Sequence, residues 1–162
     1  MRRSLGLAAL LYGVAGLAYG LDRVTKLWAE HALAGRPPIR VIPGVLHLTY
    51  TTNSGGAFGI GKSSPWLFAA ATVIVVAVIV AVSARLPGRL VAVALGLVLG
   101  GALGNLTDRA LGGPGLTGRV TDFIDLRVWP VFNLADSAIV VGAVLLAASS
   151  LAREPEARAR EG

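Results

Sequence analysis

The chain has 162 residues, of which 54% are hydrophobic and 15% charged, and its mean hydropathy is +0.69. A soluble domain carries about 25% charged residues, so this composition indicates that lipid is the solvent. The absence of cysteine excludes disulfides, thiolate metal sites and a cysteine nucleophile, and two histidines are too few for a histidine-rich metal site. The net charge of +6 is scattered between apolar runs, which indicates membrane-flanking charge and no nucleic-acid partner.

Four apolar stretches are long enough to cross a bilayer, at about residues 5–28, 66–84, 89–109 and 131–151. Each is close to the ~20 residues that a helix needs to span the hydrocarbon core. Backbone groups in lipid must be satisfied within the segment, so each span is expected to be a helix. We predict an all-α membrane protein with four transmembrane helices, built as one integral membrane domain over residues 1–152 and followed by a charged, frayed cytoplasmic tail at 153–162.

The first stretch also resembles a secretory signal peptide, because Arg2 and Arg3 precede an apolar run. However, no clear A-x-A cleavage site is present after it, and the run ends in the polar cluster at residues 22–26. We therefore expect a retained first helix. Asp22 and Lys26 lie four residues apart and share one helix face with Thr25, either as an interfacial anchor or as part of a site.

The connection after the first span contains β-branched residues and a Pro43-Gly44 turn. This pattern predicts a small β-hairpin or sheet at the membrane surface, over about residues 36–52. The next segment, at residues 52–59, is polar and glycine-rich and includes Asn53 and Gly55. It is either an ordinary loop or a place where the backbone approaches a ligand closely.

Positive charge in the short flanks predicts the orientation of the chain. Arginines precede the first span, occupy the tight turn at Pro87-Gly88 and come after the fourth span, so these three segments are assigned to the cytoplasm. The longer connections, about residues 29–65 and 107–130, then face outside. All five aspartates consequently fall at or near the outer side: Asp22, Asp108, Asp122, Asp125 and Asp136.

The third span combines a glycine ridge with a polar end. Glycines at residues 96, 100 and 104 recur every four residues, which allows close helix packing in lipid. Asn105, Asp108 and Arg109 continue this face, either as a structural Asp–Arg network or as part of a catalytic site. At the start of the fourth span, Asn133 is placed to cap the helix, with Asp136 three residues later in the first turn.

Carboxylates are the most abundant chemical groups outside the apolar runs. No Ser-His-Asp triad is plausible, and no serine lies convincingly beside Lys26 or Lys62 for a Ser-Lys dyad. Two carboxylates about 3 Å apart cannot both ionise, so such a pair can activate water and protonate a leaving amine. The residue types alone point to Asp136 paired with either Asp122 or Asp125.

At these residues the chain resembles the lipoprotein signal peptidases, also called type II signal peptidases. Each motif alone is weakly specific, whereas five in this order among four spans are specific. They are Asp22-Arg23-Val24-Thr25-Lys26, Asn53-Ser54-Gly55-Gly56-Ala57-Phe58, Gly101-Ala102-Leu103-Gly104-Asn105-Leu106-Thr107-Asp108-Arg109, Thr121-Asp122-Phe123-Ile124-Asp125 and Phe132-Asn133-Leu134-Ala135-Asp136. One departure is the glycine-rich stretch at residues 110–120, which is longer than the family pattern and leaves the shape of that outer loop open.

The resemblance implies a bacterial inner-membrane aspartyl endopeptidase that removes the signal peptide of a prolipoprotein, just before a cysteine carrying diacylglycerol. It implies no metal or other cofactor, and inhibition by the cyclic peptide globomycin. A monomer is expected, because the glycine ridge can be used internally. Catalytic roles map onto Asp122 and Asp136, and dyad support or substrate binding onto Asn53, Gly55, Asn105, Arg109 and Asn133. A structural polar network maps onto Asp22, Lys26, Asp108 and Asp125.

Two other classes of function stay open from the residues alone. A small transporter or channel subunit would use Asp22, Asp108 and Asp136 as a proton or cation relay. A membrane scaffold would only bind partners and perform no chemistry.

Overall fold

The computed structural model describes residues 2–55 and 65–161 of the chain. Within them, four helices are long and apolar enough to cross a membrane, at Arg3–Leu33, Trp66–Arg85, Arg89–Leu111 and Leu134–Leu151. Three short strands form one antiparallel sheet in the order β1-β2-β3. The prediction of a mostly helical membrane protein with four spans and a small β-sheet is confirmed.

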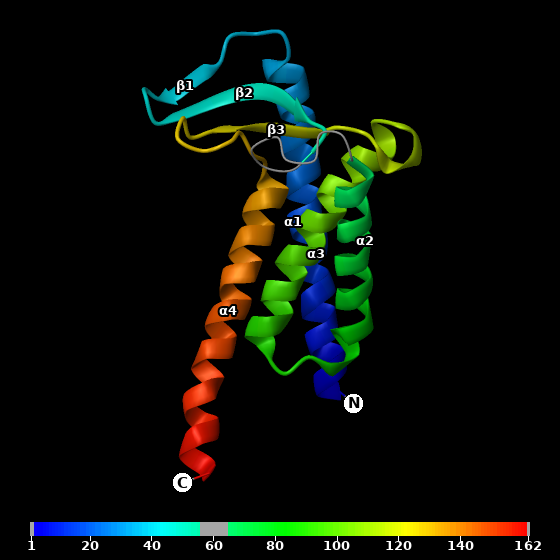
Figure 1. Cartoon of the computed structure of the whole chain (residues 1–162), viewed down its shortest axis with the longest axis vertical. Coiled ribbons are helices and arrows are strands. Elements are labelled where there is room, and N and C mark those ends of the chain that lie inside the picture. The colour runs from blue at the N-terminus through cyan, green and yellow to red at the C-terminus, as the bar shows by residue number, and fades with distance from the viewer. Residues whose placement is uncertain (1, 56–64, 162) are drawn as a thin grey trace.

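The elements succeed one another along the chain as α1 (Arg2–Leu33), β1 (Ile39–Ile42), β2 (Leu46–Asn53), α2 (Pro65–Val82), the 3₁₀ turn η2 (Ser83–Arg85), α3 (Arg89–Leu111), the 3₁₀ turn η3 (Pro114–Leu116), β3 (Val120–Asp125) and α4 (Leu134–Glu161). Figure 1 shows the four helices side by side with the sheet at one end of the bundle. Both termini and the α2–α3 connection lie at the opposite end. The segment after Ala152, expected to be frayed, instead continues α4 as a helix to Glu161.

The central helix of the bundle is α3, which packs against α1, α2 and α4. Its glycines make this possible: a Cβ added at Gly100 would lie 2.5 Å from the carbonyl oxygen of Ala15 in α1. A Cβ at Gly104 would overlap the carboxyl group of Asp22, also in α1. The glycine ridge therefore serves close packing inside the chain, as its spacing predicts.

The sheet lies over the end of α1. Pro43 and Gly44 form the predicted turn between β1 and β2, and Gly44 has a positive φ of 76°. Ile124 and Phe123 of β3, with residues of β2, pack on the last turns of α1, where the rings of Phe123 and Trp28 meet edge to face at 6.4 Å. The sheet is thereby fixed to the helix that carries the first motif.

The sequence pattern did not predict a third strand, which lies within the long connection at residues 107–130. β3 pairs antiparallel with β2, placing Asp122 opposite Thr51 and Asp125 opposite His47. The glycine-rich stretch before β3 folds back on α3, because the Gly118 N–H donates to the Arg109 carbonyl oxygen at 3.0 Å. A strand at this place holds the fourth motif in a fixed position above the helices.

The chain returns from β3 to α4 through a short, hydrogen-bonded segment. The backbone of Phe132 pairs with Ile124, with N···O distances of 2.8 and 3.1 Å. Helix α4 then begins at Leu134, and not near residue 131 as hydropathy suggests, because Asn133 caps it. This return brings the fourth and fifth motifs together.

Candidate active site

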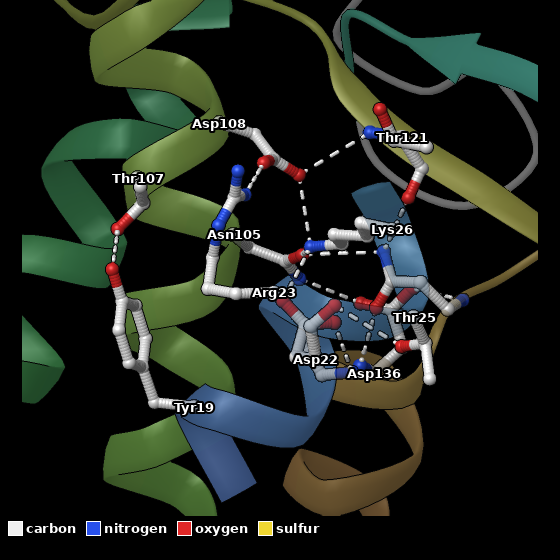
Figure 2. A network of polar contacts seen from close by, with 12 residues as sticks. Tyr19, Asp22, Arg23, Thr25, Lys26, Asn105, Thr107, Asp108, Thr121 and Asp136 are labelled. Atoms are coloured by element: carbon white, nitrogen blue, oxygen red, sulfur yellow. Dashed lines mark hydrogen bonds and ion pairs between the residues drawn. The ribbon is translucent and has the colours of Figure 1, made fainter. Parts of the chain in front are cut away.

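A buried ion-pair cluster joins α1 to α3 just below the sheet. It consists of Asp22, Arg23, Lys26 and Asp108 (Figure 2). The Lys26 ammonium nitrogen lies 2.8 Å from Asp22 Oδ2 and 2.8 Å from Asp108 Oδ2, and Arg23 pairs with the other oxygen of Asp108. Two cations and two anions balance within the cluster, which is what buried charges require.

The ion-pair cluster also holds the elements that carry the other aspartates. Asp22 Oδ1 accepts a hydrogen bond from the backbone N–H of Ala135, at the start of α4, over 2.9 Å. Asp108 Oδ2 accepts one from the N–H of Thr121 in β3 over 3.3 Å. Thr25, predicted on the same helix face, donates to the α1 backbone carbonyls of Leu21 and Asp22. The cluster therefore ties α1 and α3 to the first turn of α4 and to β3.

A second group of acids, Asp122 of β3 and Asp136 of α4, lines one cavity of about 480 Å³. Asp122 Oδ1 accepts a hydrogen bond from Asn133 Nδ2 over 2.7 Å, and Asp136 Oδ1 accepts one from Asn105 Nδ2 over 2.8 Å. Each carboxylate thus receives its own carboxamide donor. Asp122 and Asp136 are called the dyad below.

The start of α4 explains how Asp136 is aimed. Asn133 Oδ1 accepts the backbone N–H of Asp136 over 2.9 Å, and the N–H of Asn133 points back to Asp136 Oδ2 over 3.3 Å. This reciprocal pattern is that of a capping box, so the predicted cap is confirmed. The same cap directs the other end of the Asn133 amide to Asp122.

Burial and charge favour a proton on Asp122. Burial raises the pKa of Asp122 to about 7, and the negative charge of Asp136 adds to this rise. Hydrogen bonds from Asn133 and Asn53 oppose it. Among the described residues, neither dyad member has a cation within ion-pair distance. Near neutral pH such a pair can hold one proton between two carboxyl groups.

The cavity has a polar end and apolar walls. Its polar end is formed by Asn53, Gly55, Asn105 and Arg109 around the dyad. Arg109 is buried and donates to the backbone oxygens of Asn105 and Gly55 at 3.3 and 3.4 Å, while its Nε finds no hydrogen-bond partner among the described residues. The apolar walls come from one face each of α2, α3 and α4, and from residues 129–132.

Most of the residues predicted for the site meet here, and Asp125 does not. It lies at the far end of β3, where its carboxylate accepts hydrogen bonds from the backbone and side chain of Arg127. The backbone N–H of Arg127 holds the pKa of Asp125 below its usual value. The prediction missed Arg23, although it stands inside the first motif. Residues 56–58 of the second motif and Lys62 lie outside the described residues.

Comparisons with known proteins agree on one family. The model of the family described as signal peptidase (SPase) II matches residues 14–152. A lipoprotein signal peptidase of Desulfitobacterium hafniense is 39% identical over 155 residues, covering 94% of this chain and 99% of the relative. One of Syntrophomonas wolfei is 46% identical over 127 residues, covering 78% and 82%.

Two solved structures are similar in fold. Both are described as bacterial membrane enzyme structures determined by the in meso method, at 2.3 and 1.9 Å resolution. Their TM-scores are 0.74 and 0.73, with 31% and 32% sequence identity. The matches cover 85% of this chain in both cases, and 85% and 90% of the solved chains.

Proposed function

This chain belongs to the signal peptidase II family, the lipoprotein signal peptidases, and on that premise we propose that it is an aspartic endopeptidase whose catalytic pair is Asp122 and Asp136. Family membership makes it a bacterial multi-pass membrane protease that processes the signal peptides of prolipoproteins. The proposal adds the mechanism and the position of the cut, which falls just before the cysteine that carries diacylglycerol.

The proposed reaction is a direct attack of water on the scissile carbonyl. The charged member of the dyad takes a proton from the water as its oxygen bonds to the carbonyl carbon. The protonated member donates a hydrogen bond to the developing oxyanion. As the C–N bond breaks, the pair returns a proton to the leaving nitrogen, so no covalent enzyme intermediate is needed.

One observation carries the proposal: buried Asp122 and half-buried Asp136 line the same cavity, and each accepts a hydrogen bond from a neutral amide, with no cation at ion-pair distance among the described residues. The pKa of about 7 for Asp122 supports proton sharing, because it lies near the pH at which a general acid–base works best. Arg109 and the amides of Asn53 and Asn105 surround the pair, where they can hold the substrate backbone. A relay for ions is less well supported, since Asp22 and Asp108 are already paired with Lys26.

The apolar part of the cavity suits the signal helix of the substrate. Phe68 and Val75 of α2, Val98 of α3 and Ile139 of α4 line it. An apolar helix lying there would bring its carboxyl end to the polar end of the cavity. The acyl chains of the modified cysteine would remain in the bilayer beside the site.

The hairpin of β1 and β2 is proposed to rest at the lipid boundary and to place the lipidated cysteine beside the dyad. Ile39, Val41 and Ile42 are each about half exposed, at 47–50%, which is expected for side chains that contact lipid instead of a protein core. The sheet end would face outward, because the opposite end carries the short arginine-containing segments. The chain is proposed to act as a monomer, since its glycine ridge is used inside the bundle.

The direct test uses purified protein and a prolipoprotein bearing the diacylglyceryl group. Wild-type protein should release the signal peptide, and globomycin should block the release. Asp122→Asn should lower kcat by about 10² to 10⁴, close to abolition in such an assay, because it removes one partner of general acid–base catalysis. The variant should still insert in the membrane.

Asp125→Asn is the matched control, since it changes an aspartate of the same strand that points away from the cavity. It should cleave at close to the wild-type rate. Retained cleavage by Asp122→Asn, at a rate similar to that of Asp125→Asn, would exclude this dyad.

A further inference from the structure

Three asparagine side chains surround the dyad, and each can present either of two ends. A carboxamide has an acceptor end, Oδ1, and a donor end, the NH₂ group. Only the donor end stabilises a carboxylate, whereas the oxygen would repel it. The site therefore needs something to fix the orientation of each amide.

Backbone groups fix two of the three. Asn133 Oδ1 accepts the N–H of Asp136 over 2.9 Å, so its NH₂ group faces Asp122. Asn53 Oδ1 accepts the N–H of Gly55 over 2.9 Å, and its side chain hydrogen-bonds to Asp122. A backbone N–H can only donate, so neither side-chain amide can flip its oxygen and nitrogen without losing a hydrogen bond.

A side chain fixes the third. Asn105 Oδ1 accepts Lys26 Nζ over 2.8 Å and Asn133 Nδ2 over 3.2 Å, and Asn105 Nδ2 donates to Asp136 Oδ1 over 2.8 Å. The ammonium group has three donors and no acceptor, so it excludes the reversed amide. Lys26 is 2% exposed, and it is held in place by Asp22 and Asp108 on its other sides.

We propose that Lys26 is a positioning residue for catalysis: its ammonium group fixes the carboxamide of Asn105 so that an N–H always faces Asp136. The first motif then acts on the chemistry through one amide, in addition to bracing α1 against α3. This inference rests on the proposed function, because it assigns a task toward one member of the dyad.

The alternative is that Lys26 only neutralises Asp22 and Asp108. The two roles differ in the effect of removing the ammonium group. A purely bracing lysine would lower stability and leave the chemistry of folded molecules unchanged. If lysine has a positioning role, its removal would leave the longer hydrogen bond from Asn133 Nδ2, at 3.2 Å, to oppose reversal of the Asn105 amide. The amide oxygen would then face Asp136 for part of the time, which weakens the support of the charged dyad.

The first test compares Lys26→Met with Arg23→Met. Both remove one cation that pairs with Asp108, but only Lys26 touches Asn105. Lys26→Met should lower kcat by about 10- to 100-fold. Deleting such a hydrogen-bond donor altogether costs about 10²- to 10³-fold. The loss in Lys26→Met should be smaller, because the Asn105 amide still presents its N–H to Asp136 for part of the time. KM should change little. Arg23→Met should keep the wild-type kcat in folded protein.

The pH profile of kcat separates an action of Lys26 on the dyad from bracing alone. The acidic limb should move to higher pH in Lys26→Met and stay in place in Arg23→Met. In the described part of the chain, the cations that act on the dyad are Lys26 from α1 and Arg109 from α3, and Arg109 is the same in both variants. A shift in only one variant therefore reports the loss of Lys26.

A charge-balanced pair guards against loss of folding. Lys26→Met combined with Asp108→Asn removes one cation and one anion, and Asp108→Asn alone keeps the contact between Lys26 and Asn105. The double variant should show the lowered kcat and shifted profile, and the single variant should not. The inference would be overturned if Lys26→Met and Arg23→Met had equal kcat values and pH profiles, and if the double variant and Asp108→Asn did as well. Absence of both Lys26 variants from the membrane would also overturn it. Activity in Asp122→Asn would instead overturn the proposed function.

Discussion

Two groups of aspartates lie at the sheet end of the bundle, and they differ in what surrounds them. Asp22 and Asp108 belong to the ion-pair cluster, where Lys26 and Arg23 cancel their charge. Asp122 and Asp136 line the cavity and receive hydrogen bonds from asparagine amides. The same residue type is thus placed in a closed, charge-balanced setting and in an open one whose donors are neutral.

This contrast indicates how one small membrane protein separates support from chemistry. A cation in contact with a carboxylate favours its ionised form and opposes sharing of a proton. An amide donor aims the carboxylate and perturbs it less. Carboxylates that hold helices together are therefore paired with cations, and carboxylates proposed to move protons are paired with amides.

The greatest change in stability is expected from Asp22→Asn. The substitution leaves Lys26 with one anion fewer in a buried site and weakens the hydrogen bond to the N–H of Ala135. Breaking a buried ion pair costs about 3–5 kcal/mol, so the thermal midpoint in detergent should fall clearly. An unchanged midpoint would show that the ion-pair cluster does not support the fold.

A pH-dependent effect of opposite sign is expected from Asp122→Asn. The pKa of Asp122 is raised in the folded protein from 3.8 to about 7, so the folded state binds the proton more tightly than the unfolded state. The resulting stabilisation is complete below about pH 3.8 and is lost as the pH rises through about 7. At about pH 8, Asp122→Asn should therefore be more stable than wild type, by an amount on the order of a few kcal/mol.

Thermal midpoints measured from about pH 5 to pH 8 test this sign. The advantage of Asp122→Asn over wild type should grow across that range. Asp125→Asn is the matched control and should change the midpoint little from about pH 5 to pH 8, because the contacts of Asp125 with the backbone and half-exposed side chain of Arg127 are local. A variant that became relatively less stable as the pH rises would contradict the raised pKa.

The sequence predicts the helices and the cap well, for a physical reason. Lipid leaves the helix as the only state for an isolated apolar span, so hydropathy alone locates the four spans. Asn133 and Asp136 are three residues apart, and the capping pattern between them is local. Both features depend on neighbours along the chain, which the sequence displays directly.

The parts that the sequence does not predict depend on distant contacts. β3 pairs with β2, which lies about 70 residues away in the sequence. The aspartates of β3 also obscure the alternation of polar and apolar residues that is typical of a strand. Its run of Val120, Phe123 and Ile124 after a glycine-rich stretch was the available signal. The choice between Asp122 and Asp125 depends on the direction in which each points from β3. The pairing of Arg23 with Asp108, and the orientation of the Asn105 amide, likewise require the packed helices.

Infrared difference spectroscopy of the carboxyl groups is the sharpest test of the shared proton, because it detects a protonated carboxyl group. The comparison is wild type against Asp122→Asn, with Asp125→Asn as control. At about pH 6, wild type and Asp125→Asn should show a protonated-carboxyl band that Asp122→Asn lacks, and the band should fade as the pH rises through about 7. A band of equal strength in all three proteins would mean that Asp122 and Asp136 share no proton.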